Sequence, residues 1–124
     1  MTELEMLNEV CNAYTSDTRA TDGYDCQYRT KEGLKCAIGR FLPEEEEYYS
    51  FTGTVDELFI EFPELQDTEP FKGKPMWFLE WLQSLHDKEI NWIKTGLSIE
   101  GKLTANNIKE ELNHDKITIE KKSK

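Results

Sequence analysis

The stretch from Cys26 to Pro43 constrains the fold most, because it contains the clearest β-hairpin pattern in the chain. Polar and apolar residues alternate on both sides of Lys31-Glu32-Gly33, which is typical of half-buried strands. A short loop with Gly at a left-handed position is a common hairpin connection. We therefore predict an antiparallel hairpin in which Thr30 lies opposite Leu34, Tyr28 opposite Cys36, and Cys26 opposite Ile38.

Helical patterns fill most of the remaining chain. Thr2 with Glu5 and Thr54 with Glu57 form capping boxes, which mark helix N-termini. Apolar residues at helical spacing follow each box and recur after Pro75. The patterns predict helices over residues 3–14, 44–51, 54–62 and 75–94, a last helix capped by Thr104, and a short strand at 117–119.

The helix over 75–94 has the strongest apolar character, so we expect it to lie at the centre of the fold. Its sharpest stripe consists of Phe78, Trp81, Leu82 and Leu85, and Trp92 continues it. The predicted fold class is α+β, mainly helical, with four to five helices and one small antiparallel β-hairpin packed on this central Trp-rich helix. We expect a single globular domain over residues 1–120 and a frayed tail at 121–124.

The charge of the chain is strongly acidic and uneven. The formal net charge is −10, of which residues 1–70 carry −12 (17 Asp and Glu, 5 Lys and Arg) and residues 71–124 carry +2 (8 and 10). Direct binding to nucleic acid needs clustered Lys and Arg against phosphate, so this balance argues against it. A partner with a basic surface is compatible with it, since opposite charges steer association.

Other bulk features favour a cytoplasmic protein. No apolar run approaches the roughly 20 residues that a membrane span needs. The first ten residues carry acids where a signal peptide has cations. The cysteine count of three is odd and no secretory signal accompanies it, so we expect reduced thiols. The missing apolar run predicts no contact with a membrane. The chain has no Gly-rich phosphate loop, HExxH or GxSxG motif, and we expect no cofactor.

Two motifs stand out in the middle of the chain. The first is Tyr28, Gly33 and Cys36-Ala37-Ile38-Gly39 followed by Leu42, and the second is Phe78-Leu79, Leu82-Gln83, Leu85-His86-Asp87 and Trp92. Together they resemble the Y…G…CA(V/I)G…L and FL…LQ…HD…W blocks of small uncharacterised proteins from bacteria and their phages. The resemblance covers residues 24–92. It implies a hairpin packed on the Trp-rich helix, in a phage or prophage setting, and it implies no activity.

Cys36, His86 and Asp87 are candidates for catalysis if the hairpin packs on the 75–94 helix. In that hypothesis the Cys36 thiol attacks, His86 is the base and Asp87 orients it, as in a small thiol-dependent hydrolase or transferase. Against it, Cys36 is predicted on the core face of a strand, where a reactive thiolate is disfavoured. Adjacent helical residues also point about 100° apart, so Asp87 does not naturally orient the ring of His86. The structural alternative is that His86 or Asp87 satisfies a loop backbone group while small residues let the hairpin approach closely.

Two metal hypotheses are weaker. Cys26, Cys36 and His86 could bind zinc, but a zinc site needs four ligands and usually contains clustered pairs. Glu44–Glu47 could attract calcium, yet successive helical residues fan out instead of converging on one ion. We therefore expect no metal site.

The preferred interpretation is a small, acidic, non-enzymatic interaction protein, encoded by a phage or prophage, that binds and inhibits or modulates a host protein through its acidic half. Tyr beside carboxylates combines contact area with electrostatic steering. If the partner binds DNA, the acids could imitate phosphates. An exposed Trp77 or Phe71 would instead indicate a homodimer. The expected partner-binding residues are Glu44, Glu45, Glu46, Glu47, Tyr48, Tyr49, Asp56, Glu57, Glu61 and Glu64.

Overall fold

The structure is a computed structural model that describes residues 1–19, 21–22, 25–26, 28–29 and 33–122. Within these residues the fold is mainly helical, with short antiparallel strand pairs, so the predicted α+β class is confirmed. The α-helices are α1 (Glu3–Ala13), α2 (Glu46–Tyr49), α3 (Val55–Glu61), α4 (Met76–Asp87) and α5 (Ile99–Lys122). The strands are β1 (Thr21–Asp22), β2 (Asp25–Cys26), β3 (Trp92–Ile93) and β4 (Gly96–Leu97), and the 3₁₀-helices are η1 (Gly39–Phe41), η2 (Pro63–Asp67) and η3 (Glu89–Asn91).

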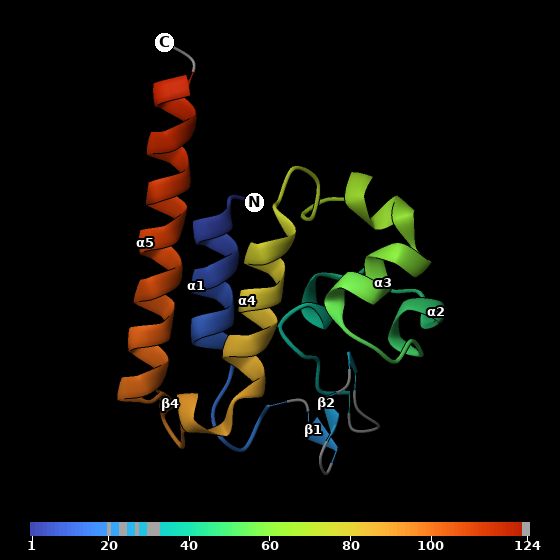
Figure 1. The fold of residues 1–124 in the computed structure, drawn as a ribbon. Coiled ribbons are helices and arrows are strands. Elements are labelled where there is room, and N and C mark those ends of the chain that lie inside the picture. Colours follow the sequence, from blue (N-terminus) through green and yellow to red (C-terminus); the bar gives the residue numbers. More distant parts are fainter. Residues whose placement is uncertain (20, 23–24, 27, 30–32, 123–124) are drawn as a thin grey trace.

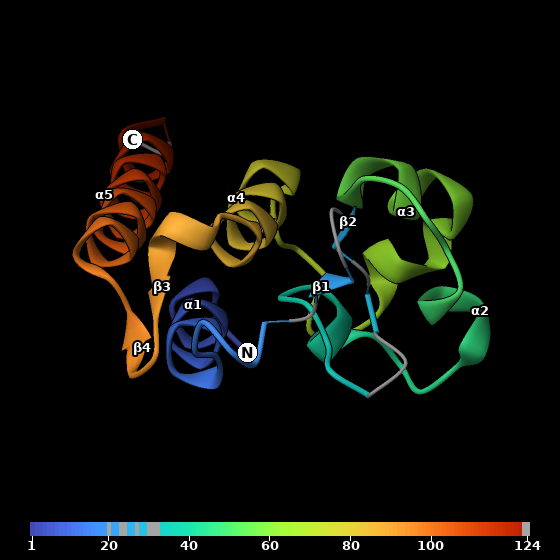
Figure 2. The ribbon, with the colours of Figure 1, turned by 90° about the horizontal axis from the view of Figure 1, so that it is seen from below.

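The molecule has two ends that meet along α4 (Figures 1 and 2). At one end α1, α4 and α5 contact one another as three long helices standing side by side. At the other end lie α2 and α3, and α3 packs on the opposite side of α4. α4 is therefore central, as its apolar sequence predicts.

Local signals at two helix starts are confirmed by the structure. Thr2 with Glu5 and Thr54 with Glu57 form complete capping boxes at the N-termini of α1 and α3. The helix expected over 44–51 is shorter than predicted, since α2 has only four residues and begins at Glu46. Among the described residues, no helix is both long and apolar enough to cross a membrane.

The predicted hairpin forms with the expected register, but it is shorter than predicted. Arg29 pairs with Lys35 in an antiparallel bridge, and the Cys36 amide donates to the Tyr28 carbonyl at 3.3 Å, as the predicted register requires. Ile38 is not in a strand, because the chain turns into η1 directly after Cys36. Cys26 pairs with Thr21 in β1 instead of with Ile38, so this part of the prediction is wrong. The expected loop at 31–33 and the position of Thr30 lie outside the described residues, apart from Gly33.

The helix predicted over 75–94 ends at Asp87, and Trp92 begins a strand. Side chains from elsewhere satisfy the carbonyls of its last turn. Arg19 donates to the carbonyls of His86 and Asp87 at 3.1 and 2.9 Å, and the Trp92 indole donates to those of Leu85 and His86 at 3.0 and 3.1 Å. Helix C-termini leave carbonyls without intrahelical partners, and these donors allow the helix to stop here.

The apolar face of α4 also differs from the predicted stripe. Its buried residues are Phe78, Leu79, Leu82, Leu85 and His86, whereas Trp81 is 41% exposed. Trp81 lies at the edge of the buried face and makes an edge-on ring contact with Trp77, with centroids 5.1 Å apart. Phe71, which the sequence left as an exposed candidate, is buried against Phe59.

α5 begins five residues before the predicted cap. Ser98 precedes it, and its hydroxyl accepts a hydrogen bond from the Gly101 amide at 3.0 Å, as an N-cap side chain does. Thr104 lies inside the helix and donates to the Glu100 carbonyl at 3.0 Å. The strand predicted at 117–119 is wrong, because the helix continues through these residues to Lys122.

Candidate functional site

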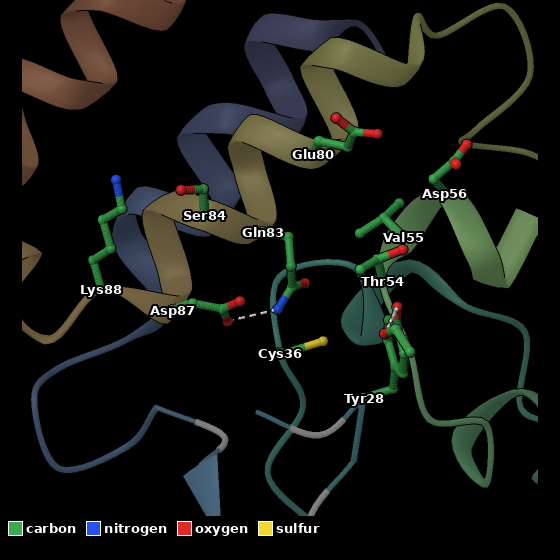
Figure 3. A pocket seen from close by; sticks show the side chains of 11 residues that line it. Tyr28, Cys36, Thr54, Val55, Asp56, Glu80, Gln83, Ser84, Asp87 and Lys88 are labelled. Atoms are coloured by element: carbon green, nitrogen blue, oxygen red, sulfur yellow. Dashed lines mark hydrogen bonds between the residues drawn. The ribbon is translucent and has the colours of Figure 1, made fainter. Parts of the chain in front are cut away.

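A cleft of about 750 Å³ opens between α4 and the turn that leads into α3 (Figure 3). One wall comes from α4 and the residue after it, and the opposite wall comes from the turn and the first residues of α3. Tyr28 and Cys36 complete the lining at the lower end in Figure 3. The walls consist of Glu80, Gln83, Ser84, Asp87 and Lys88 on one side, and Gly53, Thr54, Val55 and Asp56 on the other.

Hydrogen bonds across the site fix these segments relative to one another. The Ile38 amide donates to the Gln83 side chain at 3.2 Å, which ties the segment after Cys36 to α4. The Tyr28 hydroxyl donates to the Gly53 carbonyl at 3.1 Å, which ties the same region to the turn before α3. Both walls of the cleft are therefore anchored to the segment that contains Tyr28 and Cys36.

Cys36 is a buried thiol with little nucleophilic character. It is only 1% exposed, and its Sγ accepts a hydrogen bond from the Gly39 amide at 3.2 Å. Burial raises the pKa of the Cys36 thiol to about 12, with a smaller opposing effect from the Gly39 amide. The thiolate is the nucleophile in cysteine chemistry, so this environment counts against the hypothesis of a thiol-dependent enzyme.

We expect Cys36 in the native protein to resist iodoacetamide at pH 8. Relative to an ordinary thiol, a pKa of about 12 lowers the thiolate fraction by roughly three orders of magnitude, and burial also limits access. The measurement is mass spectrometry of the Cys36 peptide after labelling in buffer and in 8 M urea, with rapid labelling expected only in urea. Fast labelling of native Cys36 would restore the thiol hypothesis.

His86 and Asp87 do contact each other, contrary to the prediction from helical spacing. His86 is fully buried, and its Nδ1 lies 2.9 Å from Oδ1 of Asp87. The same oxygen accepts a hydrogen bond from Gln83 at 2.7 Å, one turn earlier on α4. Adjacent side chains can meet here because Asp87 is the last residue of the helix and its carboxylate folds back along α4. The ring of His86 also packs edge-on against Tyr14, with centroids 4.7 Å apart.

The zinc hypothesis remains a prediction, because the side chain of Cys26 lies outside the described residues. Cys36 and His86 are both buried, and Cys36 already accepts the hydrogen bond of the Gly39 amide. In the part of the chain that the structure describes, no group of three or more His, Cys, Asp or Glu residues could hold a metal ion.

Some of the acidic residues singled out in the sequence are engaged within the molecule. Glu44 forms an ion pair with Lys35, and Glu46 forms one with Arg29. Both cations also lie over the ring of Tyr49, at 5.2 Å for Lys35 and 4.3 Å for Arg29. Outside this group, Glu57 belongs to the capping box of α3.

Other acidic residues gather around Tyr48. A hydrogen bond with the carboxyl of Glu45 raises the pKa of the Glu47 carboxyl above its usual range, and the charges of Glu45 and Glu64 add smaller effects. Burial raises the pKa of the Tyr48 hydroxyl, and the charges of Glu64, Glu45 and Glu47 add to this effect. Glu47 is therefore close enough to both Glu45 and Glu64 for their negative charges to act on it.

The two tyrosines do not offer the contact area expected from the sequence. Tyr48 and Tyr49 are 5% and 6% exposed, because both rings pack into the hydrophobic core. The exposed members of the predicted partner-binding set are carboxylates, and Asp56 and Glu61 belong to them. Asp56 also lines the cleft.

Sequence reasoning missed Glu80, Gln83 and Lys88 as members of a cleft. Glu80 and Gln83 lie on a helix that the sequence marks as core, and the facing wall is more than twenty residues away along the chain. Patterns within a helix carry no information about which distant turn faces it. The available signal was that these polar residues interrupt the apolar helix on one side.

No protein-family model matches this chain, and comparisons with curated proteins and with solved structures gave no match. The resemblance of the two motifs to small phage proteins therefore stays a prediction.

Proposed function

We propose that this protein is a non-enzymatic interaction protein that binds a basic surface of another protein through its acidic end. The observation that carries the proposal is the distribution of charge. Between Arg40 and Lys72 the chain contains ten Asp and Glu residues and neither Lys nor Arg. This segment builds α2, α3 and η2, which lie together at one end of the molecule (Figure 1).

The cluster of Glu45, Glu47 and Glu64 supports this proposal. A hydrogen bond with the Glu45 carboxyl raises the pKa of Glu47 most, and the charges of Glu45 and Glu64 add a repulsion that disfavours the cluster in the isolated protein. A basic surface placed against these carboxylates would relieve the repulsion and accelerate association. By contrast, Glu44 and Glu46 already have cationic partners within the chain.

The setting suggested by the motif resemblance is a phage- or prophage-encoded protein that acts in the cytoplasm of a bacterial host and inhibits or modulates a host factor. A DNA-binding host protein is one partner of suitable charge. In that case the carboxylates imitate phosphates, and duplex DNA competes for the same surface.

The test is affinity capture from nuclease-treated bacterial lysate at low and high salt, read by mass spectrometry. We expect one dominant basic protein that is lost at high salt, because exposed charges are screened within about 10 Å at 0.1 M salt. The triple variant Glu45→Gln, Glu47→Gln and Glu64→Gln should weaken capture about tenfold, equivalent to about 1.4 kcal/mol.

A matched control removes the same charge elsewhere. The variant Glu100→Gln, Glu110→Gln and Glu111→Gln changes three exposed residues of α5 and should leave capture nearly unchanged. Equal losses of capture in both triple variants would mean that the net charge of the protein, and not the position of these carboxylates, determines binding. Capture that does not respond to salt would contradict the proposal.

A further inference from the structure

The cleft between α4 and the turn into α3 has a negatively charged rim. Glu80 and Asp87 lie on α4, and Asp56 lies in the first turn of α3. All three residues are exposed, and Lys88 is the only cation among the described lining residues. Figure 3 shows Asp56 on the α3 side of the opening, with its carboxylate directed toward the outer edge, and Glu80 and Asp87 on the α4 side. Both sides of the rim therefore carry negative charge, which attracts a cation toward the opening.

The interior of the cleft is mixed in character. Gln83, Ser84 and Thr54 contribute polar side chains, whereas Val55 contributes an apolar one. Its volume of about 750 Å³ falls in the range of roughly 300–1,000 Å³ that is typical of ligand sites. Such a space accommodates a long side chain together with part of its backbone.

The walls are held in place without a ligand. Asp87 accepts a hydrogen bond from Gln83 at 2.7 Å, and Gln83 in turn accepts one from the Ile38 amide at 3.2 Å. The turn before α3 is held through the bond from Tyr28 to Gly53 at 3.1 Å. A preformed site lowers the entropic cost of binding.

From these observations we infer that the cleft binds an arginine side chain of the basic partner protein. Arginine fits the site because its apolar stem suits the Val55 side, and its planar guanidinium can donate to carboxylates on both walls. A lysine ammonium is a compact point charge without this planar fork of donors. The inference rests on the proposed function, since it names the contact by which the partner is recognised.

The first experiment titrates the full-length, ¹⁵N-labelled protein with N-acetyl-arginine-N-methylamide and follows amide chemical shifts. We expect saturable shifts centred on Gly53, Thr54, Glu80 and Ser84. The neutral isostere, N-acetyl-citrulline-N-methylamide, should produce shifts at least tenfold weaker at the same concentration. Equal responses to the two probes, or no saturable shift in the cleft, would overturn the inference.

Two substitutions test the carboxylates directly. The double variant Asp56→Asn and Glu80→Gln keeps the size of both side chains and should weaken arginine binding about tenfold. Glu110→Gln on α5 is the control, because it removes an exposed carboxylate outside the cleft and should bind as the unmodified protein does. An unchanged spectrum away from the substituted residues verifies the fold, and unchanged arginine affinity in the double variant would refute the inference.

Lysate capture separates this inference from the proposed function. If the double variant captures the basic partner as well as the unmodified protein does, the cleft inference is wrong and the proposed function stands. If the arginine probe binds in the cleft but no basic protein is captured, the proposed function is wrong and the cleft remains a guanidinium site. Reduced capture by the double variant, together with arginine binding, supports both.

Discussion

Substituting Gly39 by alanine is expected to destabilise the protein by about 3 kcal/mol or more, the upper part of the range for overpacking. A Cβ at this position would lie 2.0 Å from the Tyr28 carbonyl oxygen and 2.9 Å from its carbon. Both are backbone atoms, so no side-chain rotation can relieve the clash. The Gly39 amide also donates to Cys36, and this contact would shift with the backbone.

The measurement is urea and thermal unfolding followed by circular dichroism, with a melting temperature lowered by about 10 °C or more. Gly33→Ala is the matched control. Its φ of +86° strains an alanine, but nothing lies within 4 Å of the added Cβ. It should therefore cost only about 1–2 kcal/mol. If the Gly39→Ala variant is no less stable than the Gly33→Ala variant, the backbone of Gly39 does not lie as close to the Tyr28 carbonyl as described.

Gly101→Ala is the second substitution with a large expected effect. It should destabilise the protein, although helix propensity alone predicts that alanine stabilises a helix. Alanine in a helix is favoured over glycine by about 1 kcal/mol. Here the added Cβ would lie 2.2 Å from the Asn91 carbonyl oxygen and 2.7 Å from the side chain of Leu97. The Leu97 side chain can rotate, but the Asn91 carbonyl also accepts the Ser98 amide at 2.8 Å and is held in place.

We expect a net loss of about 2 kcal/mol for Gly101→Ala, since the clash outweighs the propensity gain. Asn106→Ala is the control, because Asn106 is an exposed residue of the same helix. It should stabilise the protein by about 0.5 kcal/mol through propensity alone. The measurement is urea unfolding of both variants, with the two changes in the free energy of unfolding compared at an unchanged m-value. Stabilisation by Gly101→Ala would mean that η3 does not approach α5 as closely as described.

Local features of the fold could be predicted from the sequence because their partners are neighbours in the chain. The capping boxes of α1 and α3 each involve two residues three positions apart. The register of the bridge between Arg29 and Lys35 follows from the alternation of residues and the short loop. The central position of α4 follows from its apolar composition.

The candidate site was predicted only in part. Cys36, Asp87 and Asp56 were named from the sequence, and the structure places all three in the lining of one cleft. Their chemical character was decided by surroundings that no local pattern reveals. Burial determines the high pKa of Cys36, and packing of the core removes Tyr48 from the surface.

The end of α4 shows most clearly what the tertiary structure decided. The apolar pattern continues to Trp92, yet the helix stops at Asp87. Its terminal carbonyls are satisfied partly by Arg19, which lies 67 and 68 residues away from His86 and Asp87. The sequence by itself determined where α1 and α3 begin and the acidic charge, because capping and composition are local properties. Only the tertiary structure decided where α4 ends and which turn faces it, because hydrogen bonds and packing between distant segments set both.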